Sequence, residues 1–131
     1  MKEENQTNSK FLDTNLWIAY ITKKHHSDII DSEEKLFLSI LSLFEIKKKL
    51  LKDNISKVEI DENMKFIKEK SIILSVNESI VDKAVEKSIF YKVPAIDSLI
   101  YATALLNKST FITLENDFRG LENVQVLDIV E

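Results

Sequence analysis

The chain has 131 residues, a net charge of −4 at pH 7 and no cysteine. Its length fits one domain with a hydrophobic core, and its 44% apolar and 31% charged residues are typical of a globular protein rather than a disordered one. The lack of cysteine excludes disulfides, thiolate catalysis and thiolate metal sites, and the negative charge argues against a broadly basic nucleic-acid-binding protein.

The first nine residues are polar and predict a flexible tail, which leaves residues 10–131 as a single domain. They contain no apolar stretch of the kind that a secretory signal needs, so we expect a cytoplasmic protein without membrane contact. The apolar residues of segment 10–13 predict a buried strand that ends at Asp13. A helical pattern over residues 16–22 follows this strand directly.

Residues 29–35 predict a second short helix or a connection, and residues 36–40 are apolar enough for a second buried strand. Ser42 and Glu45 have the spacing of a capping box, in which Ser42 caps a helix and Glu45 lies in its first turn. Such a role would make Glu45 a residue that serves only the helix backbone. Taken alone, Glu45 is better explained in this way than as a site residue.

An apolar stripe over residues 55–70 predicts one or two helices, and residues 72–76 predict a third strand. Asn77 is well suited to cap the helix that follows. The apolar residues of that helix recur at helical spacings as far as about Tyr91. Strands and helices therefore continue to alternate.

Pro94 disfavours helix in the residue before it, and residues 95–106 then predict a strongly apolar helix with Asp97 in its first turn. An acidic residue there favours the helix dipole, which is a sufficient structural explanation. However, Asp97 is the only charged residue between Pro94 and Lys108. A buried carboxylate is unfavourable unless it is paired or binds a metal, so Asp97 is a candidate site residue.

Residues 110–114 predict a fourth strand, a polar turn with Glu115 and Asp117 follows it, and residues 124–127 predict a fifth strand. Strands that alternate with helices indicate a mostly parallel sheet covered on both faces. The predicted fold class is therefore α/β, as a three-layer α/β/α sandwich with a sheet of four or five strands.

Acidic residues recur where this fold places the carboxyl ends of strands or the starts of helices. They are Asp13, Glu45, Asp97, Glu115 and Asp117. Ligand crevices of open α/β sheets lie outside the carboxyl ends of the strands. Carboxylates that lie close together raise one another's pKa. A hard divalent cation such as Mg²⁺ usually compensates their negative charge. Such a site suits phosphodiester hydrolysis, as in two-metal nucleases.

The same residues resemble the motifs of PIN-domain ribonucleases. Residues 13–15, Asp-Thr-Asn after an apolar strand, are similar to the opening motif, and residues 43–46 are similar to the second. Residues 94–104 resemble the third motif most specifically, and residues 111–118 resemble the last. Four motifs in this order and context cover nearly the whole chain, from residue 10 to residue 127.

This resemblance implies a compact α/β/α domain and an endoribonuclease that depends on Mg²⁺ or Mn²⁺ and leaves a 5′-phosphate and a 3′-hydroxyl. Many members of the family are VapC toxins of VapBC toxin–antitoxin pairs. Such toxins are typically homodimers that a small antitoxin protein holds inactive.

By the same resemblance, the catalytic and metal-holding carboxylates are Asp13, Glu45, Asp97 and Glu115. The family usually has aspartate where Glu115 stands, so Asp117 is an alternative fourth ligand, and either one or two metal ions fit. Two residues would orient the site by hydrogen bonds, namely Asn15 and Thr113. Four lysines are candidates for contacts to the RNA backbone, namely Lys23, Lys24, Lys47 and Lys48.

Two other hypotheses fit parts of the pattern. A non-catalytic PIN-like module would serve as a partner-binding scaffold, and Glu115 is the one departure that favours it; metal binding distinguishes it from the enzyme. A phosphoryl-receiver-like domain is also α/β with an acidic pocket, but it needs an aspartate after the third strand and a lysine after the last. The chain has Ser75-Val76-Asn77 and Leu127-Asp128 at these places.

Overall fold

The computed structural model describes residues 9–130, so most of the predicted tail, residues 1–8, lies outside the described residues. Five parallel strands form one sheet in the order β3-β2-β1-β4-β5. They are β1 (Lys10–Leu12), β2 (Leu36–Ser39), β3 (Ser71–Leu74), β4 (Thr110–Thr113) and β5 (Val124–Val126). The predicted α/β fold with a mostly parallel sheet is confirmed.

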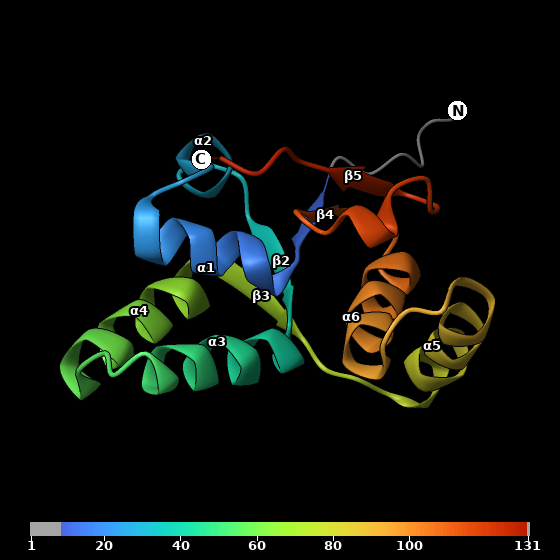
Figure 1. Ribbon diagram of the computed structural model, residues 1–131, viewed down its shortest axis with the longest axis horizontal. Coiled ribbons are helices and arrows are strands. Elements are labelled where there is room, and N and C mark those ends of the chain that lie inside the picture. The colour runs from blue at the N-terminus through green and yellow to red at the C-terminus, as the bar shows by residue number, and fades with distance from the viewer. Residues whose placement is uncertain (1–8, 131) are drawn as a thin grey trace.

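Helices cover both faces of this sheet, with α1, α3 and α4 on one side and α5 and α6 on the other (Figure 1). The helices are α1 (Thr14–Lys23), α2 (Ser27–Ile30), α3 (Ile40–Lys52), α4 (Lys57–Lys70), α5 (Glu78–Tyr91), α6 (Ala95–Leu106) and the short 3₁₀ helix η2 (Asn116–Phe118). In the described part of the chain no single helix is long and apolar enough to span a membrane; α5 and α6 together pass this test by length and composition, with a bend of 119° between them.

Two separate cores follow from the alternation of side chains along the strands. Phe11 is the register partner of both Phe37 and Phe111, and these three rings face α6. Leu12 and Ile112 point to the opposite face, where they pack with α1, α3 and α4. Because both faces are covered, each strand reads as a short continuous apolar run, which is why the strands were visible in the sequence.

The strand β1 is at the centre of the sheet, with β2 and β3 on one side of it and β4 and β5 on the other. A crevice forms outside the carboxyl ends of strands at such a reversal of strand order. Leu12 of β1 pairs with Ile112 of β4, so the residues that follow them, Asp13 and Thr113, lie side by side at this point.

Asn77 caps α5 as predicted, because its side-chain Oδ1 accepts a hydrogen bond from the Ile80 N–H at 3.0 Å. We expect Asn77→Ala to lower the free energy of unfolding by about 1 kcal/mol, since the start of α5 would lose its side-chain acceptor. Urea unfolding measures this change. Asn77→Asp keeps the acceptor and is the matched control; an alanine variant as stable as the aspartate variant would contradict the capping role.

Candidate active site

Asp13 is the most buried carboxylate at this crevice, with 5% of its surface exposed. Its backbone N–H still donates to the Ile112 carbonyl (2.9 Å), so β4 holds it in place. One carboxylate oxygen accepts from the Thr14 N–H at 2.8 Å, and the other accepts from the Thr113 hydroxyl at 2.7 Å. Burial raises the pKa of Asp13 to about 7 despite these hydrogen bonds, and the nearby charges of Asp97 and Glu45 raise it further.

Glu45 lies in the second turn of α3, not in the first, and the predicted capping box is wrong. The helix begins two residues before Ser42, at Ile40, because the Ser39 hydroxyl accepts a hydrogen bond from the Leu41 N–H at 3.0 Å and caps it. Ser42 is buried inside the helix. Glu45 therefore does not serve the helix backbone; its carboxylate accepts a hydrogen bond from the Thr14 hydroxyl at 2.6 Å.

Asp97 lies in the first turn of α6, as predicted, and is half-buried. Burial raises its pKa, and the charges of Glu45, Glu115 and Asp117 raise it as well. Three other carboxylates are thus close enough to disfavour the ionised form of Asp97. The same surroundings would favour a cation among these side chains.

Glu115 and Asp117 follow β4 and are both exposed. The Glu115 N–H donates to the Thr113 hydroxyl at 3.0 Å, which ties the start of this turn to the residue that holds Asp13. The Asn15 side chain accepts from the Leu114 N–H at 3.4 Å, so both predicted orienting residues lie at the junction of β4 with α1. Their role in orienting the site stays a prediction.

These groups surround one cavity of about 230 Å³ at the switch point of the sheet. It is lined by Asp13, Thr14, Asn15, Ile18, Glu45, Asp97 and Glu115. Four of the five predicted acidic residues line this cavity, whereas Asp117 does not, although its charge acts on Asp97. Among residues 9–130, no three His, Asp or Glu side chains are already arranged to hold a metal ion. The donor set itself consists of carboxylates, which hard cations prefer, and the raised pKa values of Asp13 and Asp97 fit such a group.

The four predicted RNA-contacting lysines fall into two places. Lys23 and Lys24 lie at the far end of α1, a helix of ten residues that separates them from Asp13 by about 15 Å. Lys24 instead packs over the ring of Tyr20, with its Nζ 4.4 Å from the centroid. Lys47 and Lys48 lie on α3 just after Glu45 and are exposed, so only this second pair is near the cavity.

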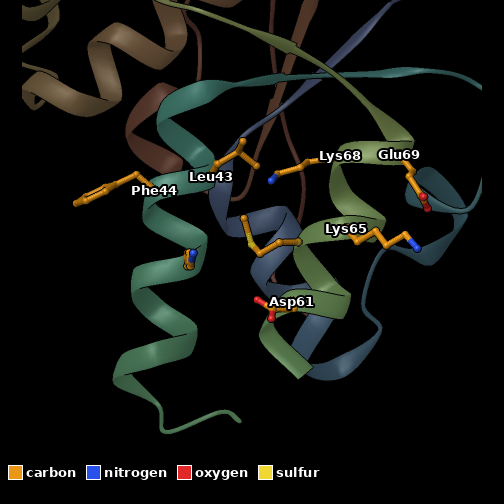
Figure 2. Close-up of a pocket in the computed structure, with 8 residues that line it drawn as sticks. Leu43, Phe44, Asp61, Lys65, Lys68 and Glu69 are labelled. Atoms are coloured by element: carbon orange, nitrogen blue, oxygen red, sulfur yellow. The ribbon is translucent and has the colours of Figure 1, made fainter. Parts of the chain in front are cut away.

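A larger cavity of about 460 Å³ lies between α3 and α4. It is lined by Leu43, Phe44, Lys47, Asp61, Met64, Lys65, Lys68 and Glu69. Figure 2 shows the side chain of Lys68 extending from α4 toward Leu43 on α3. Leu43 and Phe44 directly precede Glu45 on α3, and the groove that they line carries three lysines.

Sequence reasoning missed Thr14 and Ser42. The Thr14 hydroxyl is 2.6 Å from Glu45 Oε1 and 2.9 Å from the Ser42 hydroxyl. Ser42 and Glu45 are three residues apart, which places them on one face of a helix. From the sequence alone, this spacing predicts a helix cap, whereas the structure shows a shared contact across two helices.

The family model of the PIN domain matches residues 10–124. No curated protein matches the sequence significantly. Among solved structures, a toxin–antitoxin complex from Klebsiella pneumoniae matches with a TM-score of 0.80 and 21% identity, over 92% of this chain and 100% of that one.

Two further matches have the same architecture. VapBC2 from Rickettsia felis, bound to a DNA fragment from its promoter, matches with a TM-score of 0.74 and 16% identity over 91% of this chain and 97% of that one. VapC20 from Mycobacterium tuberculosis, a Sarcin-Ricin loop cleaving toxin, matches with a TM-score of 0.70 and 14% identity over 87% and 95%. At these identities the likeness is one of fold.

Proposed function

Because this chain belongs to the PIN domain family, we propose that it is a metal-dependent endoribonuclease, the toxin of a toxin–antitoxin pair. The observation that carries the proposal is the convergence of Asp13, Glu45, Asp97 and Glu115 on one cavity. These residues come from four separate parts of the chain, so a purely local structural role does not explain their meeting. Carboxylates gathered in this way suit the hydrolysis of a phosphodiester in RNA.

The proposed cofactor is Mg²⁺ or Mn²⁺, and Asp13, Glu45 and Asp97 would hold it, with Glu115 or Asp117 as a further ligand. Such an ion, when bound, supplies a Lewis acid for the phosphoryl group and lowers the pKa of a water molecule. The protein's own contribution is to hold the carboxylates still. Thr113 and the Thr14 N–H do this for Asp13, since each donates to one of its oxygens.

The proposed RNA contacts involve Lys47 and Lys48, which lie one turn or less from Glu45 on the exposed side of α3. Lys47 also lines the groove between α3 and α4. Lysines there would bind phosphates of the strand that leads into the acidic cavity, and their contribution would weaken as salt is added. This placement reconciles a negative overall charge with a polyanionic substrate.

The proposed protein partner is a small antitoxin, by analogy with the Klebsiella and Rickettsia complexes that share this fold. A cytoplasmic location is part of the same proposal, since RNA and an antitoxin must both be within reach. The alternative function is a non-catalytic partner-binding scaffold, which would keep the fold without the metal.

We further propose a homodimer that forms through α5. Val81, Val85 and Ile89 recur every four residues and are exposed, with Ile89 at 71%, and α5 packs mainly on α6 at one end of the molecule (Figure 1). An exposed apolar stripe of this kind marks an interaction surface. We expect the chain to sediment at twice its mass of 15.2 kDa and Val85→Glu to sediment as a monomer. Glu86→Gln on the same helix is the control; a Val85→Glu variant that stays dimeric would place the interface elsewhere.

Cleavage of a pool of structured RNAs with Mg²⁺, with Mn²⁺ or with EDTA tests the proposed activity. Cutting with either metal and none with EDTA supports the nuclease. If no RNA is cut, calorimetry of Mn²⁺ binding decides between the two functions. Bound Mn²⁺ would mean an enzyme that lacks its target RNA, whereas no binding would support the scaffold.

A further inference from the structure

Thr14 forms hydrogen bonds with two carboxylates of the acidic cavity, those of Asp13 and Glu45. Its backbone N–H donates to Asp13 at 2.8 Å, and its hydroxyl lies 2.6 Å from Glu45 Oε1. Within residues 9–130, this hydroxyl is the only hydrogen-bond donor to the Glu45 carboxylate. The distance is that of a short charge-assisted hydrogen bond.

The Thr14 hydroxyl has one proton and two neighbours, Glu45 and the Ser42 hydroxyl, which is 2.9 Å away. A carboxylate is the stronger acceptor, so Thr14 donates to Glu45 and accepts from Ser42. Ser42 is fully buried and Thr14 is nearly so. Because Ser42 is shielded from solvent, its hydroxyl keeps Thr14 as its partner, and this favours donation from Thr14 to Glu45.

We propose that Thr14 is a positioning residue for Glu45, and that Ser42 fixes the direction in which the Thr14 hydroxyl donates. Glutamate has three rotatable side-chain bonds, and Glu45 lies on α3, whereas Asp13 precedes α1. Without the Thr14 hydroxyl the Glu45 carboxylate would sample several rotamers around the cavity. With it, the distance between the Asp13 and Glu45 carboxylates is set by one rigid β-branched residue at the start of α1.

This inference rests on the proposed function and predicts a separable effect. Thr14→Val keeps the branched shape and removes only the hydroxyl. We expect it to weaken Mn²⁺ binding by about tenfold or more, as the loss of a partner that orients a metal ligand does. We also expect kcat to fall by a similar factor while KM for RNA changes by less than about twofold, because the proposed RNA contacts involve other residues. Thr14→Ser restores the hydroxyl and should restore both quantities.

The experiment measures Mn²⁺ binding by calorimetry without RNA, RNA cleavage, and urea unfolding for the wild type, Thr14→Val, Thr14→Ser and Ser42→Ala. If Thr14→Val fails to fold, Ser42→Ala carries the test, since losing the fixed donor should weaken Mn²⁺ binding in the same direction. If the wild type binds Mn²⁺ and cuts RNA, and the variants bind and cut equally well, this inference alone is overturned. A wild type that does neither would overturn the proposed function and this inference with it.

Discussion

Asp97→Asn is expected to abolish RNA cleavage. The rate should fall by more than the roughly 100-fold that follows loss of a residue that only hydrogen-bonds to a metal ligand. Asparagine keeps the size and shape of the side chain at the start of α6, so the helix should form normally. It removes the charge that acts on Glu45, Glu115 and Asp117 and with it a proposed ligand for the cation. Initial rates of cleavage with saturating Mg²⁺ or Mn²⁺ measure the loss.

Asp82→Asn is the matched control, because Asp82 is an exposed carboxylate on α5 and does not line the acidic cavity. It should cut RNA like the wild type, and neither variant should unfold at a lower urea concentration than the wild type. If Asp97→Asn cuts RNA at the wild-type rate, Asp97 holds no essential ion and the assignment of the cavity as the active site fails.

Most elements of the fold could be predicted because buried parallel strands and amphipathic helices leave different patterns. The short apolar run around Phe111 has the length of a strand, whereas the apolar segment from Ala95 to Leu106 has the length of a helix. Pro94 separates this helix from α5. Asn77 was identifiable since its cap is a local interaction between residues three apart. Local chemistry of this kind is readable from one sequence.

The start of α3 was not readable in the same way. Ser39 and Ser42 are both good caps, and Ile40 and Leu41 fit either the end of a strand or the first turn of a helix. Tertiary structure decides between them: Ser39 is at the carboxyl edge of β2, where the chain leaves the sheet, and it caps the helix at once. Glu45 consequently shifts from the first turn to the second and faces Thr14.

The candidate site was predictable as a set of residues but not as an arrangement. The order of strands places Asp13 beside Thr113, and that order cannot be derived from a single apolar run. The contact between Thr14 and Ser42 crosses two helices and has no signature in either. Lys23 and Lys24 show the reverse relation, because they are near Asp13 in sequence but lie at the far end of α1.

Asp13→Asn is expected to stabilise the metal-free protein at pH 8 while it removes activity. Burial raises the pKa of Asp13 from 3.8 to about 7, so between these values the native state keeps a proton that the unfolded chain has released. Stability therefore falls as pH rises through this window, by about 4 kcal/mol in total for the full shift. Urea unfolding in EDTA at pH 5 and pH 8 should show the wild type losing about 2 to 3 kcal/mol more than Asp13→Asn does.

Asp97 has a raised pKa as well and contributes a trend of the same sign in both proteins, which is why the difference between wild type and Asp13→Asn is the quantity to measure. Saturating Mg²⁺ should reduce that difference, because a cation that binds only the native state stabilises it and favours the ionised carboxylate. Equal pH dependence of the two proteins in EDTA would mean that Asp13 is ionised in the metal-free fold. A positive group would then have to compensate it without a metal, and the central reason for placing a cation between Asp13, Glu45 and Asp97 would be lost.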